Sequence, residues 1–136
     1  VYKRQECVDE NHQNQKAKLM KKWHAELALD DYGSGYNSEK MLLSISPKFI
    51  KIDMDIIRNI DSNPDKCKIV ENIVGYAHER EMKVIAEGIE TIEELKQVIR
   101  LRVDYLQGYL FSKPQYVPPK IRDNIVKLIQ VVNEEV

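Results

Sequence analysis

The sequence predicts an α/β fold with a parallel β-sheet, and three observations support this prediction. Short apolar runs alternate with stretches of helical periodicity, and the β-α order occurs four times along the 136 residues. The runs are apolar throughout rather than alternating, which is typical of strands buried on both faces of a sheet. The sequence has no glycine-rich phosphate loop of the Walker or dinucleotide type, which disfavours nucleotide-binding open sheets. Four βα units suit either half a barrel or a small open α/β sheet.

The predicted elements follow from apolar periodicity and from the residues that interrupt it. Helices show apolar residues three or four apart, whereas strands are short apolar runs that end at polar or glycine residues. In chain order they are a helix over 13–24, a strand over 27–29, a Gly-rich turn over 32–35, a short helix around 41–43 ended by Pro47, a strand over 49–53, a helix from 63, a strand over 84–86, a helix from 91, a strand over 105–109 and a helix after 118–119.

Two of the helices carry clear start signals. Asn63 can cap a helix, Pro64 suits its first turn, and Asp65 favours the positive end of the helix dipole. Thr91 and Glu94 have the spacing of a capping box. The apolar positions expected on the inner sides of the last three helices are Ile69, Val70, Ile73, Val74, Ala77, Leu95, Val98, Ile99, Ile121, Ile125, Leu128, Ile129 and Val132.

Composition limits the classes of function. The chain is 43% hydrophobic and 32% charged with a net charge of −1, so no basic surface for a nucleic-acid polymer is indicated. No apolar run approaches the roughly 20 residues that a membrane helix needs, and the polar N-terminus lacks a secretory signal. Cys7 and Cys67 lack metal-finger spacing and fit free thiols in a reducing cytoplasm. We expect a truncated leader and helix over 1–26 and one domain over 27–136.

Polar residues occur where the predicted strands end. In a (β/α) barrel the carboxyl ends of the strands converge on one face, and active sites are built there. We therefore expect a common site for Asp30, Asp31, Lys51, Asp53, Glu87 and Gln107.

These residue types suit metal-assisted phosphodiester cleavage. If the chain turns after the first strand, Asp30 and Asp31 can face one cavity, with Asp30 bridging two ions and Asp31 holding one. Two such ions can activate a water and stabilise the leaving oxygen. Lys51 can orient that water or neutralise phosphate charge, and Glu87 can bind the second ion or accept a proton.

Structural roles are the alternatives. Asp30 and Asp31 before Gly33 also fit a turn with side-chain capping. Lys51 inside an apolar strand needs a partner, which can be a purely structural aspartate. Glu87 and Gln107 taken alone fit ordinary strand-end positions.

Four motifs closely resemble those of EAL domains, in family order and with family-like spacing, between about residues 27 and 114. The family patterns are a DDFGTGYSS-like loop, a KID strand, AEGVET and DYxQGYxF. Their counterparts here are LDDYGSGYNS at 29–38, KID at 51–53, AEGIET at 86–91 and DYLQGYLF-SKP at 104–114.

The resemblance implies a TIM-type (β/α) barrel of which this chain covers about the last four βα units, truncated at its N-terminus. It implies a cyclic-di-GMP phosphodiesterase that produces pGpG with two divalent ions, Mg²⁺ or Mn²⁺, in the complete domain. Asp30 and Asp31 would then be metal ligands, Lys51 would contact the catalytic water, Glu87 would bind metal or assist proton transfer, and Gln107 and Asp53 would lie at the substrate. The loop after Asp31 would couple metal binding to homodimerisation.

The sequence also departs from the family. The Glu-Ala-Leu strand and a metal-binding Asn are absent, and Glu6 is the candidate for a further Glu ligand. Arg102 stands where a small residue, often Gly, is usual. The alternative function is therefore a degenerate EAL module that binds cyclic di-GMP or a protein without cleavage. We expect a cytoplasmic location, either free or as the cytoplasmic part of a larger membrane-anchored signalling protein.

Overall fold

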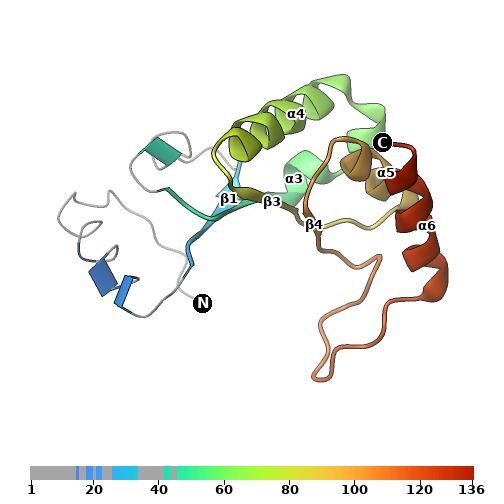
Figure 1. Cartoon of the computed structure of the whole chain (residues 1–136). Coiled ribbons are helices and arrows are strands. Elements are labelled where there is room, and N and C mark those ends of the chain that lie inside the picture. Colours follow the sequence, from blue (N-terminus) through green and yellow to red (C-terminus); the bar gives the residue numbers. More distant parts are fainter. Residues whose placement is uncertain (1–14, 16–17, 20, 23–25, 34–41, 44–45) are drawn as a thin grey trace.

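The computed structural model describes residues 15, 18–19, 21–22, 26–33, 42–43 and 46–136. The helices predicted over 13–24 and around 41–43 lie mostly outside these residues. The strands and helices, shown in Figure 1, are β1 (Ala28–Tyr32), β2 (Phe49–Ile52), α3 (Met54–Ile57), the 3-10 helix η1 (Ile60–Ser62), α4 (Pro64–Glu79), β3 (Lys83–Ala86), α5 (Ile92–Arg100), β4 (Tyr105–Leu106) and α6 (Asp123–Glu134).

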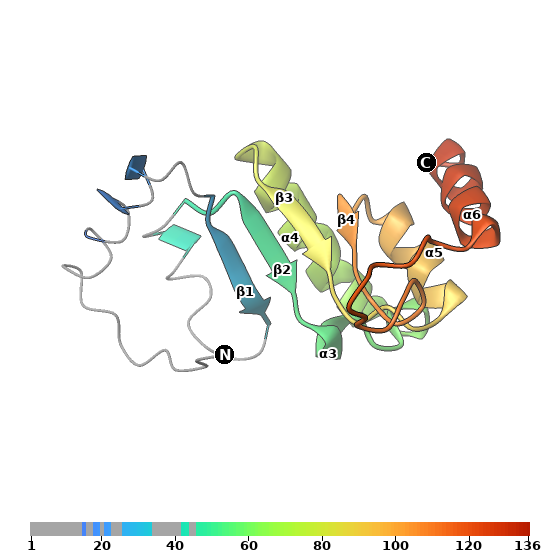
Figure 2. The ribbon, with the colours of Figure 1, turned by 90° about the horizontal axis from the view of Figure 1, so that it is seen from below.

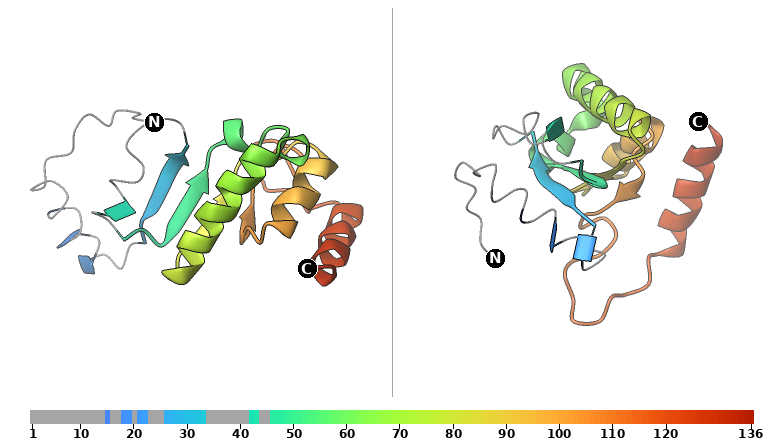
Figure 3. Two further views of the ribbon diagram at one scale, coloured as in Figure 1. Left: turned by 90° about the horizontal axis from the view of Figure 1, so that it is seen from above. Right: turned by 60° about the vertical axis from the view of Figure 1, so that its left-hand side comes forward.

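The four strands form one parallel sheet in the order β1-β2-β3-β4, which is also their order in the sequence. Figure 2 shows the four arrows side by side with α4 behind them. The left view of Figure 3 shows the molecule from the other side, where α4 lies in front of the strands. Helices α5 and α6 lie beside the β4 end of the sheet. The sequence correctly predicted a parallel α/β sheet whose strands end at one edge.

Burial of the sheet is one-sided within the described residues, as expected for a chain that covers part of a barrel. Ile50, Ile52, Val84 and Ala86 are fully buried on the face that α4 covers. Their neighbours Phe49, Lys51 and Ile85 point to the other face and are partly exposed. The reason is that the helices pack on one side only.

The start of α4 is as the sequence predicts. Asn63 Oδ1 accepts hydrogen bonds from the backbone N–H groups of Asp65 and Lys66, at 3.1 and 3.2 Å. Val70, Ile73, Val74 and Ala77 are buried on the inner side of α4. Ile69, also predicted there, is 46% exposed because it lies at the edge of the apolar stripe.

Both α4 and α5 end in a left-handed residue that is not glycine. After α4, Glu81 has φ 58°, its N–H bonds to the carbonyl of His78, and the N–H of Met82 bonds to that of Ala77. After α5, Arg102 has φ 62°, its N–H bonds to the carbonyl of Ile99, and the N–H of Val103 bonds to the carbonyl of Val98. These are Schellman motifs, whose left-handed position favours glycine. This conformation gives the physical reason for the small residue usual at position 102.

Three local features differ from the sequence predictions. The last strand contains only Tyr105 and Leu106, so Gln107 lies just beyond it. The final helix begins at Asp123, which leaves Ile121 outside it and 46% exposed. Helices α3 and η1 were not predicted, because elements of four and three residues are too short for an apolar period.

None of the helices in the described ranges is long and apolar enough to cross a membrane.

Candidate functional site

A bulge in β1 brings the two adjacent aspartates to the same site. Leu29 pairs with Ile50 and Tyr32 pairs with Ile52, so two residues of β1 lie opposite one residue of β2. Asp31 has φ 53°, a left-handed conformation that reorients its side chain. The sequence predicts that the strand ends at this point. Instead it continues through Tyr32, and the bulge produces the turn.

Three carboxylates gather at the carboxyl end of the sheet. Asp30, Asp31 and Glu87 each offer an oxygen within 4.8 Å of the others. Asp30 and Asp31 come from β1, whereas Glu87 follows β3 directly. The side chain of Glu87 is only 18% exposed, while that of Asp30 is 62% exposed. The site is therefore open to solvent on the β1 side and more enclosed on the β3 side.

Lys51 lies in β2, between the strands that carry the carboxylates. Its Nζ is 2.9 Å from Asp30 Oδ1 and also forms an ion pair with Glu87. Burial alone would lower the pKa of Lys51, but the hydrogen bonds to Glu87 and Asp30 and their negative charges outweigh it and raise the pKa. The side chain is thus held as an ammonium ion, which suits it to stabilise negative charge.

The charge of this group favours a cation. Three carboxylates face one ammonium, which leaves an excess of two negative charges among the four side chains. All available donors are oxygens, the ligands that Mg²⁺, Mn²⁺ and Ca²⁺ prefer. The residues present therefore fit a divalent metal ion.

Two of the other predicted site residues, Asp53 and Gln107, follow β2 and β4 and are not members of the carboxylate group. Asp53 caps α3, with its Oδ1 accepting the N–H of Asp55 at 2.8 Å. Gln107 is exposed beyond β4, where its backbone N–H bonds to Ala86 at 2.9 Å. Glu6 lies outside the described residues.

Two glycines allow the loops at this end of the sheet to touch. A Cβ on Gly88 would overlap the side chain of Met54, at the start of α3. A Cβ on Gly108 would overlap the backbone of Ile89, whose N–H bonds to the carbonyl of Gln107 at 3.1 Å. The loops after β2, β3 and β4 therefore pack directly against one another.

Sequence reasoning missed two carboxylates that organise the structure. The capping box identified Glu94 as a helix cap but gave no sign that its carboxylate also binds the N–H of Asn59, at 2.9 Å. Asp104 was quoted only as part of a motif, yet it binds Lys83, His78 and the N–H of Val84. Both contacts join residues distant in sequence, so no local pattern reveals them.

Comparisons with known proteins agree on one family. The EAL domain profile matches residues 3–114. The chain is 42% identical over 90 residues to the cyclic di-GMP phosphodiesterase PdeF of Escherichia coli, a match that covers 66% of this chain and 12% of PdeF. It is 39% identical over 87 residues to the cyclic di-GMP phosphodiesterase PdeL of the same organism, covering 64% of this chain and 24% of PdeL.

Solved structures have the same fold. A standalone EAL protein of Vibrio cholerae with bound cyclic di-GMP superposes with a TM-score of 0.82 at 28% identity, over 90% of this chain and 52% of that one. BlrP1 of Klebsiella pneumoniae, in complex with manganese and cyclic di-GMP, gives a TM-score of 0.74 at 31% identity, over 79% of this chain and 27% of that one. The chain thus spans about half or less of these proteins and adopts part of their TIM-type barrel.

Proposed function

We propose that this chain, which belongs to the EAL domain family, carries part of the active site of a metal-dependent phosphodiesterase that hydrolyses cyclic di-GMP to pGpG. The observation that carries the proposal is the group of Asp30, Asp31 and Glu87 around Lys51. The carboxylate oxygens of this group suit a divalent cation beside a phosphate substrate.

Asp30, Asp31 and Glu87 would hold the metal, with Mg²⁺ or Mn²⁺ as the physiological ion. When bound, the metal supplies charge stabilisation for the phosphate and lowers the pKa of a bound water. Asp30, the most exposed of these carboxylates, would be a metal ligand on the solvent side of the site. Glu6, outside the described residues, is the candidate for a further ligand.

Lys51 would act as a fixed positive charge. Its ammonium lies between Asp30 and Glu87, where it can hold the attacking water or an oxygen of the phosphate. Glu87, which is mostly enclosed and close to Lys51, would bind metal and assist removal of the proton from that water.

Gln107 and Asp53 would form the substrate side of the site. Gln107 is exposed just after β4, and its backbone is fixed on both sides by Ala86 and Ile89. Asp53 follows Lys51 by two residues and holds the start of α3. Both positions border the end of the sheet at which the carboxylates gather.

The first experiment removes one ligand charge. In the protein with its full natural sequence, Asp30→Asn should weaken Mn²⁺ binding and lower cyclic-di-GMP hydrolysis by about 100-fold or more, because an amide is a poor ligand for a hard cation. Isothermal titration with Mn²⁺ and a chromatographic assay for pGpG measure both effects. Wild-type turnover of this variant at limiting metal would make Asp30 a turn residue and refute the assignment.

The second experiment separates catalysis from binding. Lys51→Ala should lower kcat by about 100-fold, the scale of an electrostatic group at a reacting oxygen. Its affinity for cyclic di-GMP in Ca²⁺ should change much less. A full-length protein that binds cyclic di-GMP but forms no pGpG with Mg²⁺ or Mn²⁺ would instead be a receptor of the degenerate type.

Homodimerisation through the loop after Asp31 is part of the same proposal. This loop begins at Gly33, where a Cβ would overlap the side chain of Ile56, so Gly33 itself packs against α3. Sedimentation velocity of the full-length protein should show a dimer that Mn²⁺ strengthens. A monomer at all metal concentrations would refute the coupling.

A further inference from the structure

Glu94 is the one charged side chain buried among the described residues, at 1% exposure. It lies in the first turn of α5, away from the carboxylates of the candidate metal site. A buried carboxylate is costly unless several donors satisfy it. The identity of these donors shows what the residue does.

The backbone donors to Glu94 come from two different segments. Its Oε2 accepts the N–H groups of Glu90 and Thr91, at 2.9 and 3.2 Å, in the loop after β3. Its Oε1 accepts the N–H of Asn59, at 2.9 Å, in the segment after β2. A capping box needs only the bond to Thr91. The bonds to Asn59 and Glu90 therefore exceed what the start of the helix requires.

Both segments lead back to the candidate site. The segment after β2 runs from Lys51 through α3 to Asn59, whose left-handed backbone has φ 56°. The loop after β3 runs from Glu87 to Thr91. The two segments touch near the site, where Gly88 packs on Met54, and the carboxylate joins them a second time further away. Two points of contact fix their relative orientation, whereas one would leave a pivot.

We propose that Glu94 is a positioning residue, whose carboxylate fixes the segment after β2 to the loop after β3 and thereby holds Lys51 against Glu87. The inference rests on the proposed function, because it concerns the same site. Arg58 supports the link from the rim, with one nitrogen 2.9 Å from Glu90 Oε1 and the other 3.6 Å from Glu94 Oε1.

The test substitution is Glu94→Gln, which keeps the shape of the side chain. A glutamine has one acceptor oxygen, and its amide nitrogen would face a backbone N–H, so the bonds to Asn59 and to Glu90 cannot both persist. The matched control is Thr91→Ala. Thr91 Oγ1 accepts the N–H of Glu94 at 3.1 Å, so this change removes the helix cap but leaves the carboxylate and its donors in place.

Four quantities are measured on the full-length protein: the melting temperature, amide hydrogen exchange at Asn59, the Mn²⁺ dissociation constant, and kcat with KM for cyclic di-GMP. Both variants should melt at lower temperature than wild type. Only Glu94→Gln should speed amide exchange at Asn59. It alone should also raise the Mn²⁺ dissociation constant and lower kcat, each by about 10- to 100-fold, the scale for residues that orient metal ligands. Its KM should stay within about threefold, since Glu94 does not contact substrate.

Equal effects of the two variants on Mn²⁺ binding and kcat would reduce Glu94 to a helix cap and overturn the proposal. If the wild-type protein has no hydrolytic activity, the proposed function fails, while exchange at Asn59 and the Mn²⁺ dissociation constant still decide the role of Glu94. If Glu94→Gln does not fold, Arg58→Gln weakens the same link at a half-exposed position. It should then reduce Mn²⁺ affinity more than Thr91→Ala does, and an equal reduction would overturn the proposal.

Discussion

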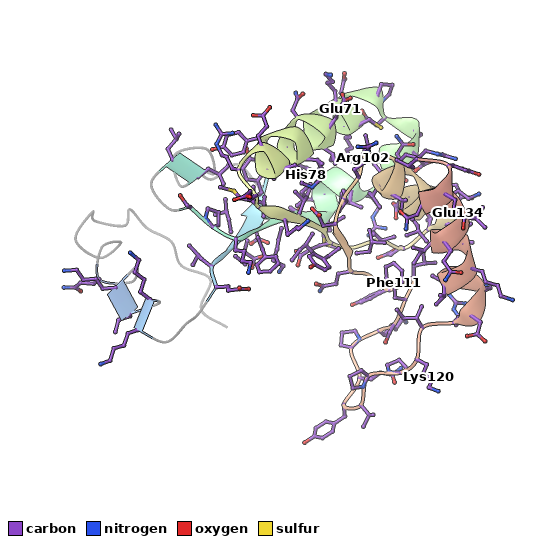
Figure 4. All side chains as sticks on the ribbon, in the orientation of Figure 1. Glu71, His78, Arg102, Phe111, Lys120 and Glu134 are labelled. Atoms are coloured by element: carbon purple, nitrogen blue, oxygen red, sulfur yellow. The ribbon has the colours of Figure 1, made fainter. Side chains whose placement is uncertain are left out.

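The two ends of the sheet each carry a cluster of charged side chains. Carboxylates outnumber the cationic group at one end, and donors outnumber the carboxylate at the other. At the carboxyl end, the described residues place three carboxylates around the ammonium of Lys51. At the amino end, one carboxylate, Asp104, is surrounded by donors: Lys83 Nζ, His78 Nε2 and the N–H of Val84, at 2.8, 2.8 and 2.9 Å. Figure 4 labels His78 near the end of α4.

The difference separates function from stability. The amino-end cluster satisfies its one charge, and the side chain of Asp104 is only 14% exposed. Burial alone would raise the pKa of Asp104, but the bonds from Lys83, Val84 and His78 outweigh it and lower the pKa. The carboxyl-end cluster brings three carboxylates together, and carboxylate oxygens are ligands that divalent metal ions prefer. In barrels, the carboxyl face carries catalysis and the opposite face stability.

The largest expected effect comes from a carboxylate-to-amide change at the functional end. Glu87→Gln should lower kcat of the full-length protein by about 100-fold or more, because it removes the carboxylate that we propose as metal ligand and proton acceptor. The unfolding free energy should change by less than about 1 kcal/mol, since the solvated Asp30 remains to pair with Lys51. Steady-state kinetics and urea unfolding measure the two effects. A large loss of stability with unchanged kcat would contradict the comparison.

The same chemical change at the other end should have the reverse outcome. Asp104→Asn replaces a carboxylate that accepts three hydrogen bonds, so it should lower the unfolding free energy by about 1–3 kcal/mol. The kcat per folded molecule should match wild type within about twofold, because the cluster lies at the end of the sheet away from the metal site. A comparable loss of kcat would show that the two ends are coupled.

Acid should reduce the difference in unfolding free energy between the wild type and Asp104→Asn. The pKa of Asp104 is lowered by folding, so its contribution to stability is complete above the unfolded pKa of about 4. The contribution is lost as the pH falls from there through the lowered folded pKa. Glu94, whose pKa is also lowered by its backbone bonds despite burial, contributes equally in both proteins. Urea unfolding between pH 7 and pH 3 should show a constant difference above about pH 5 and a shrinking one below it.

The smallest effect concerns the two left-handed turns that precede the residues of the amino-end cluster. Arg102 and Glu81, both left-handed, lie two residues before Asp104 and Lys83. Arg102→Gly should raise the unfolding free energy by about 0.5–1 kcal/mol, because glycine adopts this conformation without steric cost. The control is Arg100→Gly, in the last turn of α5, which should lower it by about as much. Equal destabilisation by both changes would refute the strain at Arg102.

Patterns local in sequence predicted much of the fold. The caps at Asn63 and Thr91 formed as their spacing indicates. The sequence also indicated that Asp30, Asp31, Lys51 and Glu87 would meet at one end of a parallel sheet, and the structure brings these four together. Such predictions succeed because a cap or a strand end depends on a few adjacent residues.

Features that depend on distant contacts were missed. The bulge at Asp31 arises from pairing with β2, and the bond from Glu94 to Asn59 spans two βα units. The one-sided burial of the sheet depends on which elements pack against it rather than on how apolar each strand is. The structure brings four of the predicted site residues together, but the chemical roles assigned to all of them stay predictions, as does the boundary between residues 26 and 27.

The order of strands has a kinetic consequence. Within the described residues, each strand pairs with its neighbours in the sequence. Closing short segments costs little entropy, and such local connectivity favours rapid folding. We expect the βα units to be added one after another as the ribosome releases the chain. Glu94 is synthesised after Asp30, Lys51 and Glu87. The hydrogen bonds from its carboxylate to the segment after β2 and to the loop after β3 therefore form when Lys51 and Glu87 are already present.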